Sequence, residues 1–208
     1  MVANKALMLV TMEPLGLSED EFNDWYDTEH LPERAVLPGF ETALRYVCLS
    51  GFPRYLAVYD LTDLSALYSE AYGAVSGAHF SPWSRRVSPR VQGRSRHEAV
   101  QLYPGDRVTG AGVALGHLAV YRFRGVGDSD VLLSGLLTRF DVDSAAEAVR
   151  LFRIEGDEMR DYLALVELNQ PLADLSLGLG RGNGIVDIAN LYAPYVRSAQ
   201  LPMKPAGR

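Results

Sequence analysis

A run of polar and aromatic residues near the N-terminus is the part of this sequence most able to do chemistry. Residues 21–32 read EFNDWYDTEHLP, and they bring aromatic rings, carboxylates and His30 onto about three turns of predicted helix. A histidine among such groups can move a proton near neutral pH. No other segment carries a comparable set, so we expect the functional site here, although the pattern specifies no reaction.

The sequence also indicates where this helix begins and ends. Ser18 followed by Glu21 forms a capping-box pattern, which predicts the start of the helix. Pro32 disfavours helix at the residue before it, so we expect His30 near the C-terminal end. There the helix dipole favours the cationic imidazole, while partial burial opposes it. His30 is our candidate general acid or base, and the alternative is that it only caps the helix or bonds a carbonyl.

Neighbouring side chains on the same helix are candidates for substrate contact. Phe22, Tyr26 and His30 follow one another at helical spacing, with Trp25 and Glu29 alongside. The alternative for Phe22 and Trp25 is packing against a sheet, as aromatic residues at this spacing usually do. A carboxylate three residues before His30 gives the pattern D-x-x-H, but the second ligand pair of a metal site is missing, so we predict no metal.

Composition excludes several classes of partner. The chain has 208 residues, of which 48% are hydrophobic and 22% charged, enough for a packed core. Its formal net charge of -6 opposes binding to phosphate backbones and anionic membranes, so neither nucleic acid nor membrane is an expected partner.

The apolar run from Ala6 to Val10 is too short for a signal peptide or a membrane span. Cys48 is a lone cysteine, which excludes an internal disulfide, and we expect a cytoplasmic protein.

Two pairs of segments repeat along the chain. Residues 43–51 match 148–156 in their pattern of apolar and basic positions, and residues 54–61 match 161–168 in the same order. Each half also opens and closes with a strand-like run, and these runs are 6–12, 118–123, 91–103 and 186–196. The predicted order of elements is therefore strand, helix, strand, strand, helix, strand, twice.

This order is that of the ferredoxin-like βαββαβ unit, an α+β arrangement with two helices on one face of a four-stranded sheet. Two such sheets can bury their free faces against each other, so we expect tandem repeats that form within one chain the barrel that single-repeat proteins form by dimerising. We assign residues 1–104 to the first repeat, 105–112 to a linker rich in turn formers, and 113–208 to the second repeat. Residues 130–140 carry no histidine, tryptophan or acidic cluster, so we expect the second repeat to be mainly structural.

The N-terminal motif resembles that of a known family. An aromatic and histidine pattern is followed by Pro-Gly-Phe and then Arg-Tyr, and the residues concerned are Phe22, Trp25, Tyr26, His30, Pro38, Gly39, Phe40, Arg45 and Tyr46. This pattern is similar to the EthD-like branch of the dimeric α+β barrel superfamily. The resemblance implies the barrel fold and a small-molecule pocket. The superfamily includes isomerases, cyclases, decarboxylases and haem-degrading monooxygenases, so the resemblance selects no chemistry.

Further candidates lie on the predicted strands and after the second helix of the first half. Arg45, Tyr46 and Tyr59 would orient or stabilise an enolate-like oxygen if their side chains face the pocket; otherwise they line a core or an interface. His79 and Trp83 are candidate substrate contacts, and a histidine in that region would also be able to ligate haem iron, as in some relatives by fold. A basic run would draw an anionic ligand toward the pocket or form a solvated strand edge, and it comprises Arg85, Arg86, Arg90, Arg94 and Arg96.

The sequence as a whole favours a small-molecule enzyme without a cofactor. We expect proton-transfer chemistry of the isomerase, cyclase or decarboxylase type on an apolar, oxygenated substrate, with His30 moving the proton. One alternative is a non-catalytic ligand-binding or assembly protein, and another is a haem or flavin monooxygenase. A pocket around His30 would favour the enzyme, whereas a His30 bonded to backbone would favour a structural role. The expected partner is a small-molecule ligand, and a homodimer is left open.

Overall fold

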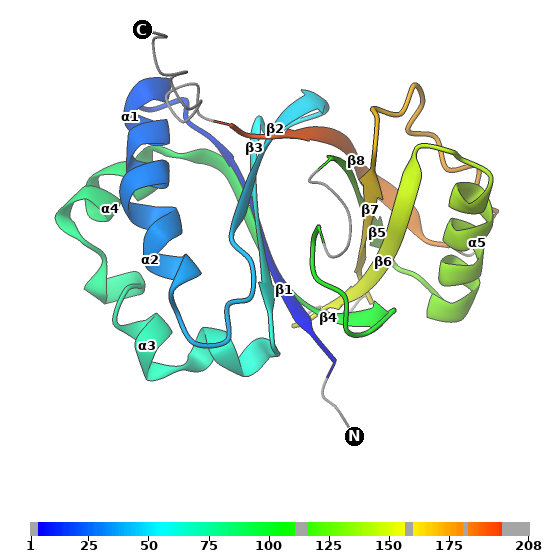
Figure 1. Ribbon diagram of the computed structural model, residues 1–208, viewed down its shortest axis with the longest axis horizontal. Coiled ribbons are helices and arrows are strands. Elements are labelled where there is room, and N and C mark those ends of the chain that lie inside the picture. Colours follow the sequence, from blue (N-terminus) through cyan, green and yellow to red (C-terminus); the bar gives the residue numbers. More distant parts are fainter. Residues whose placement is uncertain (1–3, 111–115, 157–159, 181–182, 197–208) are drawn as a thin grey trace, which may run out of the picture.

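The computed structural model describes residues 4–110, 116–156, 160–180 and 183–196, and these form a closed barrel of antiparallel strands (Figure 1). Around the barrel the order is β1-β3-β2-β8-β5-β7-β6-β4. The strands are β1 Ala6–Glu13, β2 Leu44–Ser50, β3 Tyr55–Leu61, β4 Gln92–Tyr103, β5 His117–Arg124, β6 Ala146–Ile154, β7 Tyr162–Leu168 and β8 Ile185–Pro194. Each strand expected from the sequence is present at its expected place.

The two halves of the chain contribute neighbouring parts of the barrel in the same order. The first half supplies β4-β1-β3-β2 and the second supplies β8-β5-β7-β6. One seam joins β2 to β8, where Tyr46 lies opposite Pro194, and the other joins β4 to β6, where Ala99 lies opposite Ile154. Because the ring closes within one chain, these strands leave no sheet edge along the seams where they pair.

The barrel interior is filled by side chains. Alternate residues of the strands point inward and form one cluster of buried hydrophobic side chains. Its members are Leu7, Leu9, Tyr46, Leu56, Val58, Ala99, Leu118, Val120, Phe152, Ile154, Leu163, Leu165 and Tyr192. Barrels of this size are just wide enough for side chains to fill them. The interior is therefore a core, and a ligand site has to lie outside it.

Helices of the first half cover the outer face of the sheet around β1 and β3 (left side of Figure 1). The first helical run consists of α1 Glu19–Trp25, the π-helical turn Tyr26–His30 and α2 Leu31–Ala35. The second run lies between β3 and β4, and it comprises the 3₁₀ turn Leu64–Tyr68, α3 Glu70–Gly73, the 3₁₀ turn Gly77–His79, α4 Pro82–Val87 and the 3₁₀ turn Ser88–Arg90. No helix in the described residues is long and apolar enough to cross a membrane.

The first helical run begins where the sequence predicts and ends later. Ser18 is the N-cap, and its hydroxyl accepts a hydrogen bond from the Glu21 backbone N–H at 3.2 Å. The run does not end near His30 as expected but continues to Ala35. Pro32 is accommodated at the first turn of α2, where a missing N–H is tolerated.

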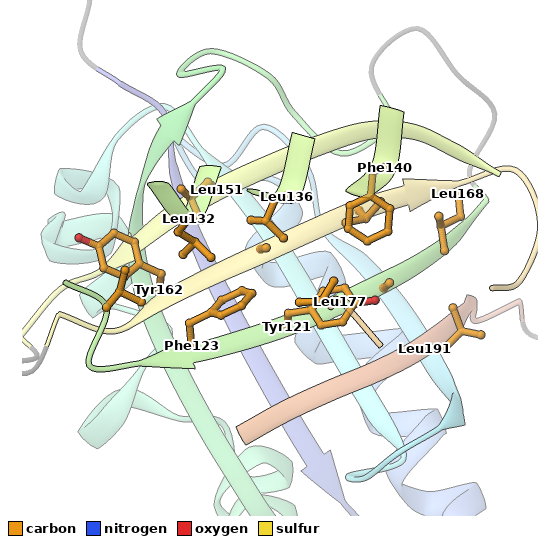
Figure 2. Packing of buried hydrophobic residues seen from close by; sticks show 14 of the residues in the cluster. Tyr121, Phe123, Leu132, Leu136, Phe140, Leu151, Tyr162, Leu168, Leu177 and Leu191 are labelled. Atoms are coloured by element: carbon orange, nitrogen blue, oxygen red, sulfur yellow. The ribbon is translucent and has the colours of Figure 1, made fainter. Parts of the chain in front are cut away.

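In the part of the second half that the structure describes there is one helix, α5 Ser129–Asp141, which packs against its part of the barrel (Figure 2). The sequence predicted another helix between β7 and β8, and this was wrong: residues 169–180 and 183–184 contain none. Proline and glycine interrupt this segment, and Gly178 has a φ of +61°, which a helix cannot contain. The segment instead packs leucines against the cluster beside α5, namely Leu172, Leu175, Leu177 and Leu179.

Strand register corrects one part of the predicted repeat. The predicted alignment of residues 54–61 with 161–168 agrees with the strand register, because the aligned residues Asp60 and Glu167 both point into the barrel. The alignment of Arg45 with Arg150 is wrong by one residue: Arg45 pairs opposite Ala57 and faces the helices, whereas Arg150 pairs opposite Leu165 and lies inside the barrel. A slip of one residue exchanges the two faces of a strand. The two arginines therefore have different environments.

Candidate active site

A pocket of about 250 Å³ lies between the outer face of the first-half sheet and its helices. Its lining residues come from β1 and β3, from the two helical runs, and from β4 and the residue before it. The lining residues are Met8, Val10, Met12, Trp25, Tyr26, His30, Arg34, Tyr59, Tyr72, Ser76, Gly77, Phe80, Ser88, Val91, Arg94 and Arg96. The pocket is thus mostly apolar, with a few polar groups, as small-molecule sites usually are.

The π-helical turn sets the positions of the histidine and its neighbours. The Leu31 backbone N–H bonds to the Tyr26 carbonyl five residues earlier, which adds one residue to the turn. The His30 ring then packs against both aromatic neighbours, with its centroid 4.3 Å from that of Trp25 and 5.0 Å from that of Tyr26. No residue pattern predicts this turn, although π-turns inside α-helices are frequent at functional sites.

His30 lines the pocket as a neutral imidazole. Its side chain is partly exposed, yet Nδ1 is buried and has no hydrogen-bond partner among the described residues. Burial, followed by the guanidinium charges of Arg34, Arg45 and Arg94, holds the pKa of His30 well below its usual value of 6.5. The helix dipole expected from the sequence does not act on His30, because the helical run continues past it. A neutral imidazole facing a pocket is suited to accept a proton.

Tyr26 and Tyr59 place two phenol groups at the pocket wall. Their hydroxyl oxygens lie 3.1 Å apart and share a buried hydrogen bond. Burial raises the pKa of Tyr26 and raises that of Tyr59 well above 10, so both remain protonated. Of the two hydroxyl hydrogens, one is used between the rings, and the other has no acceptor within the part of the chain that the structure describes. The pair can therefore donate a hydrogen bond to a ligand oxygen.

Arg34 is a site residue that the sequence reasoning missed. Its side chain is 3% exposed and donates to the backbone carbonyls of His30, at 3.2 Å, and Val75, at 3.3 Å. It thereby fixes the first helical run to the second at the back of the pocket. Its position one helical turn after His30 was the available signal, but a charged residue so close to a helix end is usually solvated.

Arg45 points toward the helices, but its side chain does not line the pocket. Its contacts are instead with residues of the first helical run. It pairs with Asp27 and donates to Asn23 Oδ1 at 2.7 Å. Its guanidinium carbon also lies 4.4 Å from the ring centroid of Tyr26. Both polar partners belong to the first helical run, so Arg45 holds the π-helical turn in place.

Tyr46 lies on the opposite face of the sheet from the pocket. Its side chain is 2% exposed among the inward-pointing residues of the barrel, and burial raises its pKa far above the usual value. A side chain inside the filled barrel cannot reach a ligand beside His30. Adjacent residues on a strand point to opposite faces, so only one of Arg45 and Tyr46 was able to face the helices.

The remaining sequence candidates lie around the pocket without lining it. Phe22 is fully buried and packs on Tyr26. Glu29 accepts hydrogen bonds from Ser81 Oγ at 2.5 Å and from Ser84 Oγ, which joins the first helical run to α4.

Two candidates from the second helical run, His79 and Trp83, do not line the pocket either. His79 is exposed, and its Nδ1 lies 3.0 Å from the Gly73 carbonyl oxygen. Trp83 packs against the core beneath α4. In the described residues no group of three or more histidine, cysteine, aspartate and glutamate side chains is arranged to hold a metal, and Asp27, half of the D-x-x-H pair, is bound to Arg45.

No family model and no curated protein matches this chain. Solved structures resemble it over nearly its whole length. A mutant chlorite dismutase from Candidatus Nitrospira defluvii aligns with 94% of this chain and 93% of its own, at 12% identity and a TM-score of 0.60. A heme-binding protein from Thermus thermophilus aligns with 92% and 91%, at 11% identity and 0.55. An anthrone oxidase-like protein aligns with 98% and 96%, at 10% identity and 0.55.

These similarities concern the fold, because identity of 10–12% carries no information on activity. The structural neighbours are dimeric α+β barrel-type proteins, and the chain has their α+β barrel architecture. This agrees with the fold that the N-terminal motif implied.

Proposed function

We propose that this protein is an enzyme that performs acid/base chemistry on a small, apolar, oxygenated substrate of one or two rings. The observation that carries the proposal is the position of His30, a neutral imidazole whose ring lines a mostly apolar pocket. Tyr26 and Tyr59 lie beside it with a hydrogen to donate.

These groups together support proton transfer next to a carbonyl. The neutral imidazole of His30 accepts a proton from the carbon beside the substrate carbonyl, and the bond electrons move onto the carbonyl oxygen. The Tyr26 and Tyr59 pair donates a hydrogen bond to the oxygen as it becomes negative. The imidazolium then returns the proton to another carbon or to the oxygen, which completes an isomerisation and regenerates neutral His30.

We infer that the site belongs to the EthD-like branch of the superfamily, on the basis of the motif around Trp25, Tyr26 and His30. We also infer two ferredoxin-like units, residues 1–104 and 113–208, joined by the linker 105–112. The recurring strand order supports this, while the missing second helix of the second unit makes the repeat unequal. Homodimer formation stays a prediction for light scattering to test, since the barrel is closed in one chain.

Haem is named for one of the structural neighbours, and this pocket fits it poorly. Its volume of about 250 Å³ lies below the range of roughly 300–1,000 Å³ that holds drug-sized ligands. A macrocycle of four pyrrole rings or a three-ring flavin needs more room than a ligand of one or two rings. We therefore propose no haem or flavin step.

Solvent exchange into an enolisable ketone tests the proposal. The two-ring ketone 2-tetralone, incubated in D₂O with the purified protein, should exchange its C1 hydrogens faster than in buffer alone, as followed by NMR. A positioned general base contributes about 10²- to 10⁴-fold. His30→Gln should return the rate to the buffer value, whereas the matched change His117→Gln on β5 should not. Binding of 2-tetralone without any exchange would instead support a non-catalytic ligand-binding protein.

A further inference from the structure

We propose that the substrate of this pocket carries a carboxylate, which Arg94 binds at the pocket mouth while the apolar rings lie against β1. This inference rests on the proposed function, because it names the substrate class of the same site. It follows from the charges that line the pocket and from what each of them already binds.

The lining has an excess of positive charge. Three arginines contribute to it, namely Arg34, Arg94 and Arg96, and its sixteen residues include no aspartate or glutamate. The chain as a whole carries a net charge of -6, so this local excess runs against the composition. A cavity with apolar walls and one sign of charge attracts a ligand of the opposite sign.

Two of the three arginines are already engaged. Arg34 is buried and donates to Glu33 and to the carbonyls of His30 and Val75. Arg96 pairs with Glu98, and its Nε lies 3.2 Å from the Met8 sulfur. Neither is free to take a ligand carboxylate without breaking bonds of the fold.

Arg94 is different. Its Nη1 donates to the Ser88 hydroxyl at 3.1 Å, and no carboxylate lies within ion-pair distance of it in the described residues. A guanidinium has five N–H donors in a planar fork, so Arg94 keeps most of its donors for a bidentate contact with a carboxylate. Because the side chain is exposed, binding does not require the charge to be taken out of a buried pair.

The position of Arg94 suits a ligand that spans the pocket. β4 runs antiparallel to β1, with Arg96 opposite Val10, so Arg94 lies further toward the Met12 end of β1. The charge of Arg94 contributes to the lowered pKa of His30, which places the two groups within electrostatic range. A ring system resting on Met8, Val10 and Met12 would present one end to His30 and the other to Arg94.

Matched ligands test this inference. The probes are 2-naphthoate and 2-naphthamide, which have the same two rings and differ in charge, and calorimetry measures both affinities. We expect wild-type protein to bind 2-naphthoate about tenfold or more tightly than 2-naphthamide, as a charge-assisted hydrogen bond provides. Arg94→Gln should remove most of this preference, and Arg94→Lys should retain part of it through its charge alone. Arg153→Gln on β6 removes the same charge from an exposed position away from the pocket and should change nothing.

The possible outcomes separate this inference from the proposed function. If both probes bind equally and Arg94→Gln has no effect, while His30-dependent exchange of 2-tetralone is seen, the carboxylate assignment fails and the acid/base function stands. If the preference depends on Arg94 but no exchange occurs, the carboxylate site stands and catalysis fails. If neither probe binds at millimolar concentration, the carboxylate assignment is wrong. Circular dichroism of each variant confirms that it is folded.

Discussion

The guanidinium carbon of Arg45 lies 4.2 Å from the ring centroid of Tyr195, just beyond β8. The Tyr195 backbone N–H also donates to the Arg45 carbonyl at 2.9 Å. The same guanidinium lies 4.4 Å from the ring centroid of Tyr26, pairs with Asp27 and donates to Asn23. The last described segment of the chain therefore covers the residue that holds the π-helical turn of the candidate active site.

Replacing Arg45 should destabilise the protein. In Arg45→Gln the Asp27 carboxylate, 11% exposed, loses its buried partner, and breaking such a pair costs about 3–5 kcal/mol. Urea unfolding followed by tryptophan fluorescence measures the change. The exposed pair of Arg86 and Glu21 is the control, since Arg86→Gln should cost about 1 kcal/mol or less. Equal losses in the two variants would mean that Arg45 is not the support described.

The hydrogen bond between Tyr26 and Tyr59 should appear as coupling in a double-mutant cycle. Each single change to phenylalanine leaves the other hydroxyl buried without its partner, at a cost of about 1–3 kcal/mol. The double variant removes both groups, so its loss of unfolding free energy should be smaller than the sum of the single losses by about 0.5 kcal/mol or more. Strictly additive losses in urea unfolding would argue against the pair.

The lowered pKa of His30 should make stability depend on pH. In the unfolded chain a histidine takes up a proton near pH 6.5, while folded His30 takes it up only at a lower pH. The stability is therefore full above about pH 6.5 and declines as the pH falls from there toward the folded pKa, by at most about 1.4 kcal/mol per pH unit. Unfolding free energies measured between pH 7.5 and 5 should decline more steeply for wild type than for His30→Gln. Parallel curves would show that His30 is not held neutral.

Arg150 should be among the most sensitive positions outside the site. It is fully buried, donates to Asp60 at 2.6 Å and to Thr109, between β4 and β5, at 2.5 Å, and lies near Glu167. Burial alone would raise the pKa of Asp60, but the Arg150 charge and hydrogen bonds from Thr42 and Thr109 hold it below its usual value. The carboxylate therefore stays charged and needs its partner.

Arg150→Met leaves two buried carboxylates without that cation and should cost about 3–5 kcal/mol in unfolding free energy. Arg153→Gln, on the same strand but exposed, should stay within about 0.5 kcal/mol of wild type. Chemical denaturation of both variants makes the comparison. A small loss of unfolding free energy in Arg150→Met would show that the contacts of Arg150 with Asp60 and Glu167 contribute little to the stability of the barrel.

The sequence alone determined the strands and the start of the first helix, and it indicated the region of the candidate site. Strand alternation and the Ser18 cap are local signals, governed by residues only a few positions apart, so they can be read without the fold. The same holds for His30 and Tyr26, which are four residues apart, whereas the contact of His30 with Trp25, five residues earlier, depends on the π-helical turn. The helix predicted between β7 and β8 was wrong because proline and glycine interrupt that segment, and its leucines pack on the cluster beside α5 instead.

The tertiary structure alone decided which of these groups can act together. It turned Arg45 toward the helices and Tyr46 into the barrel, a choice of face that strand pairing sets and a one-residue slip would reverse. It inserted the π-helical turn and left Nδ1 of His30 without a partner among the described residues. It also brought Arg94 to the pocket that His30 lines, although His30 lies more than sixty residues earlier in the chain. Such contacts depend on distant segments meeting in space, and the energy of burying a charge or leaving a polar atom unpaired exists only once they have met.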